Sequence, residues 1–205
     1  GLTAKSAAEK FKFGSFGADA QDILGDAAIN TVFIATRHDS HGPLVRKAIE
    51  ADKNVYVEKP LTIEVSDLAL IAEAARRHPA RRLQVGFNRR FAPLAVQARA
   101  LFEGVPEPLV LNYRVSAGFI PKDHWTQTGE GGGRILGEVC HFIDFLQFMT
   151  GSEPDRVFAA CVDNPNTKAK DQDNVAITVA FRNGSVGLVT YVACGDRLLA
   201  KERIE

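Results

Sequence analysis

In the first half of the chain, short continuous apolar runs alternate with stretches whose apolar residues recur at helical spacing. Continuous runs indicate buried strands, and a three- and four-residue spacing indicates amphipathic helices. We expect strands at 31–36, 54–57 and 82–86, and helices at 42–52 and 65–77. Strands and helices that alternate in this way are typical of a parallel sheet with crossover helices.

The segment before these strands is expected to form a helix over 2–12, a brief strand over 13–16 and a short helix over 19–24. A dinucleotide-binding βαβ unit normally opens with a strand and a Gly-rich turn whose backbone amides meet the pyrophosphate. No G-x-G-x-x-G or G-x-G-x-x-A pattern occurs in the first thirty residues. We therefore expect the chain to begin inside such a domain, after its first βα unit.

The pattern changes near residue 89. We expect a helix over 94–102, a strand over 109–115, a Gly-rich loop leading to a helix that ends at 150, and strands over 156–162, 174–181 and 185–192. The last two strands are joined by an Asn-Gly turn, which is typical of tight hairpins. No further element is expected in the charged stretch at 201–205 to close this sheet.

These patterns predict an α/β protein with two domains. Residues 1–88 would form an incomplete parallel βαβ domain of the dinucleotide-binding type. Residues 89–205 would form an α+β domain with a largely antiparallel, open sheet, because hairpin strands that follow βαβ units are typical of a second lobe. This second domain would also be truncated.

Composition narrows the classes of protein to consider. The 205 residues include 25 Lys plus Arg and 25 Asp plus Glu, so the formal net charge is zero. Without a basic field we expect no nucleic-acid partner. The sequence has no apolar run of about 20 residues and no signal-peptide core in 1–12, so we expect a soluble cytoplasmic protein. Cys140, Cys161 and Cys194 have neither disulfide nor metal spacing, so we expect buried free thiols.

The sequence Glu58-Lys59-Pro60 directly follows the strand at 54–57, at the end where ligands bind in open α/β sheets. A lysine there can transfer a proton to or from a hydroxyl or carbonyl group if its surroundings lower its pKa. Glu58 can pair with Lys59 or with a ribose hydroxyl, and Pro60 can fix the turn through a cis peptide bond. The alternative is a solvated charge pair at a strand end.

Polar residues also follow the strand at 31–36, at the same edge of the sheet. Ser40 or Asp39 would cap the next helix, with His41 in its first turn. These residues either serve only as caps or, together with Thr36, form one wall of a cofactor cleft.

A third group lies on the helix that ends at 150. His141 and Asp144 are three residues apart and so share a face, and Gly137 lies one turn before His141. His141 could act as an acid or base near neutral pH, with Asp144 orienting it. The alternative is a partly buried histidine whose ring nitrogens are hydrogen-bonded within the protein and that has no catalytic role. The opposite face is expected to be core, with Phe142, Phe145, Leu146 and Met149.

Three further features bear on ligand binding. Arg89 and Arg90 could clamp a phosphate or carboxylate, or simply cover a surface. Trp125 offers an apolar plate for stacking on a sugar or nicotinamide. We expect no metal site, because His38, His41, Asp123 and His124 show no recognised ligand spacing.

In order and spacing, four motifs resemble the Gfo/Idh/MocA family of NAD(P)-dependent oxidoreductases. The motifs are VFIATRHDSH (32–41), NVYVEKPL (54–61), QVGFNRRFAP (84–93) and GGGRILGEVCHFID (131–144). The resemblance implies a Rossmann domain that binds NAD or NADP, followed by a domain whose open sheet often mediates homo-oligomerisation. It also implies hydride transfer between the nicotinamide and a carbon that bears a sugar or polyol hydroxyl.

The resemblance also implies roles for individual residues. Lys59 and His141 would be catalytic. The cofactor would contact Thr36, Arg37, His41, Glu58, Lys59 and Asn88, and the substrate would contact Lys59, Arg90, Trp125 and His141.

Several departures from the family pattern qualify these roles. The family's aspartate falls on Gly137, so either Glu138 replaces it after a local shift or Lys59 and His141 act without it. The family's Pro-Asn pair is Arg37-His38. Without the Gly-rich turn, this chain alone should bind NAD(P) weakly or not at all. The residues of the motifs GGGRILGEVCHFID and ATRHDSH also resemble a subgroup in which this domain is fused behind a zinc-type alcohol-dehydrogenase-like domain. We therefore expect this chain to be a piece of a larger protein.

Two alternatives to a dehydrogenase remain from the sequence. One is an NAD-dependent glycosidase or epimerase on the same fold. The other is a catalytically silent binding or assembly module, which Gly137 and the missing turn favour.

Overall fold

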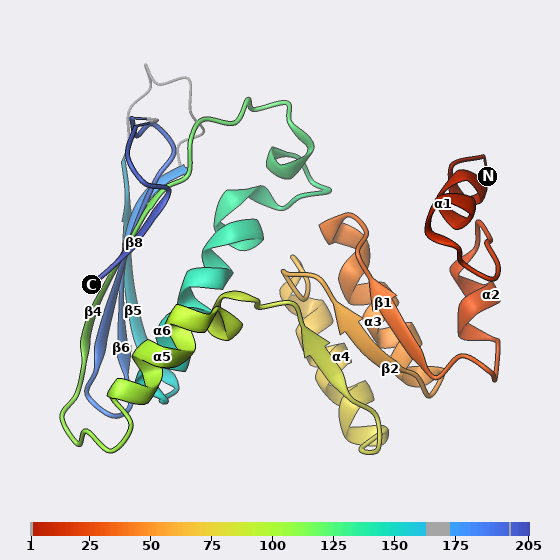
Figure 1. Cartoon of the computed structure of the whole chain (residues 1–205), viewed down its shortest axis with the longest axis horizontal. Helices are drawn as coiled ribbons and strands as arrows, with labels where there is room; N and C mark the ends of the chain where they lie inside the picture. Colours follow the sequence, from red (N-terminus) through yellow and green to blue (C-terminus); the bar gives the residue numbers. More distant parts are fainter. Residues whose placement is uncertain (1, 163–172, 197) are drawn as a thin grey trace.

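The computed structural model describes residues 2–162, 173–196 and 198–205. Two separate sheets organise these residues (Figure 1). The first contains β1 (Thr31–Ile34), β2 (Asn54–Val57) and β3 (Leu83–Val85), in that order and all parallel. The crossover helices are α3 (His38–Glu50) and α4 (Val65–Arg77). The predicted parallel sheet with crossover helices is confirmed.

The second sheet has the order β5-β6-β7-β4-β8. Its strands are β4 (Val110–Ser116), β5 (Pro154–Cys161), β6 (Asn174–Phe181), β7 (Val186–Val192) and β8 (Glu202–Ile204). Only the pairing of β4 with β7 is parallel, so the sheet is largely antiparallel, as predicted.

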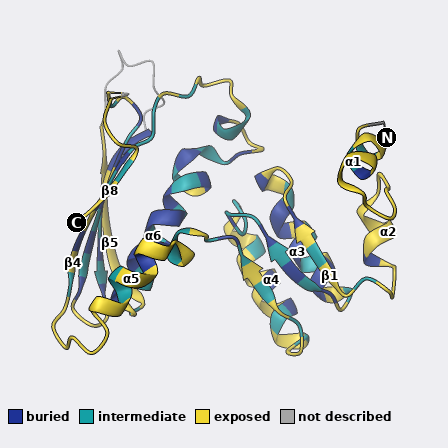
Figure 2. Cartoon of the chain, in the orientation of Figure 1, coloured by how far each residue is buried: buried dark blue, intermediate teal, exposed yellow. Residues whose placement is uncertain are grey.

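Helices cover one face of this second sheet (Figure 1). They are α5 (Pro93–Leu101) and α6 (Cys140–Thr150), and a π-helical turn, η3 (Ile135–Val139), leads directly into α6. The apolar face of α6 is core, as predicted, because Phe142, Phe145, Leu146 and Met149 are all buried. Figure 2 shows buried positions in dark blue along α6. Short 3-10 turns lie at η1 (Arg89–Phe91) and η2 (Trp125–Gln127).

The first thirty residues form α1 (Leu2–Phe11) and α2 (Ala20–Leu24), whose first turn is capped by Asp19. The strand predicted at 13–16 is wrong. Phe13 and Phe16 are 65% and 55% exposed, and none of the described strands pairs with them. Without a partner strand, the local apolar pattern does not produce a strand.

The expectation that nothing closes the second sheet is also wrong. Strand β8 pairs antiparallel with β4, through Tyr113 with Ile204 and Val115 with Glu202. Glu202 is held there by two hydrogen bonds from the Arg89 guanidinium and one from the Tyr113 hydroxyl. The charged side chain of Glu202 therefore adds to the backbone pairing that attaches β8 to β4.

Two smaller expectations need correction. Helix α3 begins at His38, four residues earlier than predicted. Its N-cap residue is Arg37, without a side-chain cap, and Ser40 donates back to the Arg37 carbonyl. The three cysteines are free thiols, but Cys161 and Cys194 are exposed rather than buried.

None of the described helices is long and apolar enough to cross a membrane.

Candidate active site

Lys59 follows β2 at its carboxyl end, and the Lys59–Pro60 peptide bond is cis. Its ammonium group donates a hydrogen bond of 2.8 Å to the carbonyl oxygen of Gly137, in the π-helical turn η3. Single π-helical turns occur frequently at functional sites because they displace backbone groups from the regular helical ladder. Lys59 is thereby fixed between the first sheet and the helix that carries His141.

His41 supports the turn that contains Lys59. Its ring is fully buried, with Nδ1 2.7 Å from the Pro60 carbonyl oxygen and Nε2 3.1 Å from the Thr36 carbonyl oxygen. The ring therefore bridges the ends of β1 and β2. Both of its nitrogens face protein carbonyls, so the structure shows a structural anchor at this position.

The other predicted cofactor residues lie in a row. Thr36, Glu58 and Asn88 follow β1, β2 and β3, and parallel strands bring their carboxyl ends to one edge of the sheet. Thr36 and Asn88 are exposed, and Glu58 is half-buried. Gly86 leaves room at this edge for the Tyr56 and Glu58 side chains, because a Cβ there would come 2.9 Å from the Tyr56 hydroxyl and 3.1 Å from Oε2 of Glu58.

The start of α3 contacts the loop that precedes α6. The Arg37 guanidinium lies over the Trp125 ring at 4.4 Å and pairs with Glu130 at 3.5 Å. Nδ1 of His38 lies 2.9 Å from the Gly131 carbonyl oxygen. These contacts place Trp125 beside Lys59 in one cavity of about 180 Å³, which His38, Gly137 and Glu138 also line.

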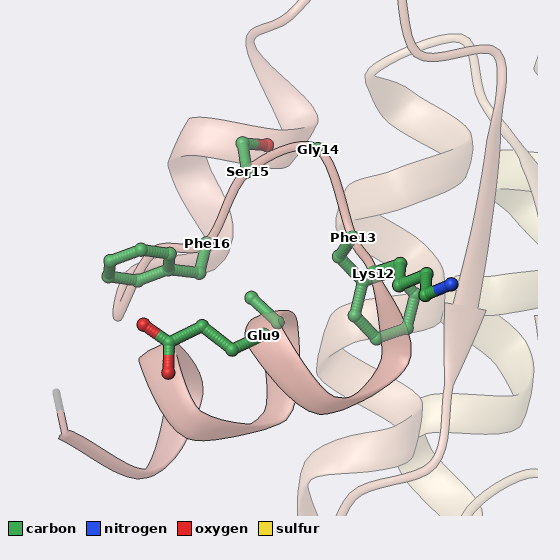
Figure 3. A pocket seen from close by; sticks show the side chains of 7 residues that line it. Glu9, Lys12, Phe13, Gly14, Ser15 and Phe16 are labelled. Carbon is green, nitrogen blue, oxygen red and sulfur yellow. The ribbon is translucent and has the colours of Figure 1, made fainter.

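A larger hollow of about 580 Å³ lies far from these residues, beside α1 (Figure 3). It is lined by exposed residues at 12–16 and by Ala8 and Glu9. None of the predicted site residues lines it, so volume alone does not locate the site.

His141 is 5% exposed, and its Nδ1 is enclosed without a hydrogen-bond partner among the described residues. Burial, together with the charges of Arg89 and Lys59, lowers the pKa of His141 to about 4. The ring is therefore uncharged at neutral pH. Only its Nε2, which is not enclosed in this way, can meet a ligand.

The expected role of Asp144 in orienting His141 is wrong. The Asp144 carboxylate accepts two hydrogen bonds from the guanidinium of Arg90, one of them from Nε at 2.9 Å. Planar bidentate pairing of this kind is the preferred geometry of an arginine with a carboxylate. Arg89 likewise holds Glu202, so both arginines clamp carboxylates of the chain itself.

Glu138 lines the cavity beside Gly137, but its carboxylate is already bound. It accepts hydrogen bonds from the Tyr191 hydroxyl and from Arg134, and Lys201 lies 3.4 Å away. Burial acts to raise the pKa of Glu138, yet the Tyr191 hydrogen bond and the two positive charges outweigh burial and lower it. Glu138 is therefore a charged anchor of η3 in this structure.

The sequence assigned no catalytic or binding role to His38, and none of the described residues form a cluster of three or more side chains suited to a metal ion. The structure instead places its ring against Gly137, where an added Cβ would lie 3.1 Å from Cε1 of His38. The sequence signal for this contact was a pair of departures from the family pattern. His38 stands where the family has asparagine, and Gly137 stands where the family has aspartate.

Comparisons with known proteins bear on the family and the fold. Residues 2–87 match the model of the oxidoreductase family with an NAD-binding Rossmann fold, and residues 98–196 match the GFO/IDH/MocA C-terminal domain. The uncharacterized oxidoreductase YrbE of Bacillus subtilis is 30% identical over 192 residues, covering 90% of this chain and 55% of that protein.

Myo-inositol 2-dehydrogenase of Thermotoga maritima is 28% identical over 178 residues, covering 83% of this chain and 52% of that protein. A solved levoglucosan dehydrogenase in complex with NADH and levoglucosan shares the fold, with a TM-score of 0.83 and 24% identity, over 100% of this chain and 59% of that one. The chain thus spans about half the length of the curated relatives it matches. It belongs to the GFO/IDH/MocA family of NAD-binding oxidoreductases.

Proposed function

We propose that this chain carries the hydride-transfer site of an NAD-dependent dehydrogenase that acts on a hydroxyl-bearing carbon of a sugar or polyol. The observation that carries the proposal is the position of Lys59, held by Gly137 at the carboxyl end of β2 beside a 180 Å³ cavity. Relatives named as inositol dehydrogenases, and the levoglucosan dehydrogenase with the same fold, support a substrate rich in hydroxyl groups.

The edge of the first sheet fits a nicotinamide dinucleotide. Thr36, Glu58 and Asn88 would line it, with the half-buried Glu58 carboxylate available to a ribose hydroxyl. Arg37 and His41 would form the wall beside it. When bound there, the cofactor supplies the acceptor or donor of the hydride.

The chain's own residues would then handle the substrate. The Lys59 ammonium has three hydrogens and gives one to Gly137, so others remain for the oxygen on the reacting carbon. Its positive charge stabilises negative charge that develops on that oxygen. Trp125 provides an apolar wall of the cavity. Uncharged His141 does not line this cavity, but its Nε2 would be available to another hydroxyl of the substrate. Arg90 remains a predicted substrate contact, although its guanidinium is paired with Asp144.

The experiment is to incubate the intact protein with NAD and either myo-inositol or levoglucosan, and to follow NADH and the sugar together. We expect NADH to accumulate in step with loss of the hydroxyl compound. Hydrolysis or epimerisation without net NADH would instead identify a glycosidase or epimerase. Saturable binding of NAD with no chemistry on either compound would identify a silent binding module, the alternative that Gly137 favours.

We also propose that the uncovered face of the second sheet forms a homo-oligomer interface. Strand register places Val110 and Phe158 on this face, and they are 70% and 72% exposed. Exposed apolar area on a flat sheet is typical of a protein interface. A cytoplasmic location is in keeping with the exposed free thiols Cys161 and Cys194, which persist in reducing compartments.

A further inference from the structure

The His38 ring is fixed at the start of α3 by contacts on two sides. It is 8% exposed, packs edge-on against Trp125 at 4.9 Å and has Nδ1 2.9 Å from the Gly131 carbonyl oxygen. A carbonyl oxygen can only accept, so Nδ1 carries the hydrogen and the neutral ring has its lone pair on Nε2. No hydrogen bond to Nε2 occurs within the described part of the chain.

This ring takes the space of a side chain at position 137. A Cβ on Gly137 would lie 3.1 Å from Cε1 and 3.4 Å from Nδ1 of His38. The carbonyl of the same glycine receives the hydrogen bond of Lys59, and both His38 and Lys59 line the 180 Å³ cavity. An acceptor and a cationic donor therefore border one cavity, on either side of Gly137.

The charge state suits an acceptor. Burial lowers the pKa of His38, the hydrogen bond to Gly131 raises it, and the electrostatic effects of Lys59 and of the neighbouring His41 ring lower it further. Asp39, the acidic group near the ring, opposes this without reversing it. His38 is therefore neutral at pH 7, with an unprotonated Nε2.

We propose that Nε2 of His38 accepts the proton of the substrate hydroxyl that Lys59 holds, which makes His38 a catalytic residue; this rests on the dehydrogenase function proposed above. In oxidation, the substrate carbon loses a hydride, for which NAD, when bound, would be the two-electron acceptor. The hydroxyl O–H bond breaks, its proton forms a bond to Nε2, and the oxygen's electron pair completes the C=O bond. The resulting imidazolium then returns the proton to water.

The test compares His38→Asn with the unaltered intact protein, using NAD with myo-inositol and with levoglucosan. Loss of a general base lowers kcat by about 10²-fold or more, with a much smaller effect on KM. The limb of the kcat/KM profile that rises with pH as His38 deprotonates should also disappear. A merely structural role would change KM or stability without removing that limb.

A second pair of variants guards against a simple folding defect. Gly137→Asp alone should impair turnover, because its Cβ meets the ring at 3.1 Å. In the double variant His38→Asn/Gly137→Asp, a carboxylate enters the vacated space and can itself accept a proton. We expect kcat at least tenfold above that of His38→Asn, with thermal unfolding followed for every variant.

Nitrogen-15 NMR of the His38 ring tests the assignment without activity. We expect a hydrogen on Nδ1 and a bare Nε2 at pH 7. A charged ring or a hydrogen on Nε2 at that pH overturns the proposal. So does a His38→Asn enzyme with kcat within twofold of the unaltered protein while Lys59→Met is inactive. If neither compound is turned over, the dehydrogenase proposal fails, and the NMR result alone decides the state of His38.

Discussion

The Lys59 ammonium donates a 2.8 Å hydrogen bond to the Gly137 carbonyl oxygen, and so ties the end of β2 to the π-helical turn η3. The two residues are far apart in sequence and belong to elements built on different sheets. Their contact holds a positive charge at the edge where cofactor and substrate would meet.

Replacing Lys59 tests whether that charge serves the reaction. Lys59→Met keeps most of the side chain's length but removes the charge and the donors. We expect turnover of myo-inositol or levoglucosan by the intact protein to fall by at least about 10²-fold, because developing charge on the reacting oxygen loses its stabilising group. NAD binding, measured by calorimetry, should change little. Lys47→Met, on the exposed surface of α3, is the matched control and should keep full activity. Normal turnover by Lys59→Met would remove this residue from the mechanism.

Local patterns predicted the elements of the chain well, because hydrophobic periodicity depends on residues a few positions apart. The ranges 54–57, 65–77 and 174–181 match β2, α4 and β6. The predicted strand at 13–16 failed because a strand needs a partner, which periodicity does not reveal. Strand β8 was missed for the converse reason, since its attachment depends on the distant residues Arg89 and Tyr113.

The site was predictable only in part. The rule that ligands bind at the carboxyl ends of parallel strands predicted Thr36, Glu58 and Lys59, and the structure places these residues at those strand ends, because the rule follows from topology. The pairing of Asp144 with Arg90 instead of His141 depends on how η1 packs against α6, a tertiary contact that helical spacing cannot reveal. The approach of His38 to Gly137 likewise joins residues about a hundred positions apart.

Stability should depend on pH through His141. Its pKa is about 4 in the folded chain against 6.5 in the unfolded one, so between these values only the unfolded chain binds the proton. The free energy of unfolding is therefore full above about pH 6.5 and falls as the pH drops toward about 4. At about 1.4 kcal/mol per unit of pKa difference, the loss is on the order of 3 kcal/mol.

Urea unfolding at pH 7.5 and pH 5 measures this dependence. In His141→Phe we expect a distinctly smaller loss over that interval, because the group that titrates is gone. Part of the loss should remain, since burial also lowers the pKa of His38. His124→Phe, at an exposed position, should behave like the unaltered protein. Equal losses in all three proteins would contradict the role given to His141.

The glycines before η3 are not equivalent. A Cβ on Gly131 would lie 2.3 Å from Cα and 2.5 Å from the carbonyl oxygen of Thr126, whereas a Cβ on Gly129 would meet nothing within 4 Å. Because backbone atoms cannot rotate away, Gly131→Ala should lower the free energy of unfolding by about 1–3 kcal/mol. Chemical denaturation should show Gly129→Ala to be nearly neutral. An equally small effect at Gly131 would show that η2 shifts readily.

The proposed oligomer interface can be tested on a single strand. Phe158 and Val157 of β5 are 72% and 70% exposed but lie on opposite faces of the sheet. Phe158→Glu places a charge on the uncovered face and should shift the protein toward monomers in size-exclusion chromatography with light scattering. Val157→Glu introduces the same charge on the helix side and should leave the oligomer intact. A protein that is monomeric before any substitution would contradict the proposal.

The ion pair of Arg90 and Asp144 separates a structural role for Arg90 from a substrate contact. The Asp144 side chain is only 9% exposed, so Arg90→Gln leaves a buried carboxylate without its charged partner. We expect the free energy of unfolding to fall by about 2 kcal/mol, the scale of hydrogen bonds to charged groups. The double variant Arg90→Gln/Asp144→Asn should recover part of this loss, because the unpaired charge is gone. Arg156→Gln, where the arginine side chain is 84% exposed, is the control and should change stability little. A rise in KM for myo-inositol without any loss of stability in Arg90→Gln would instead assign Arg90 to the substrate.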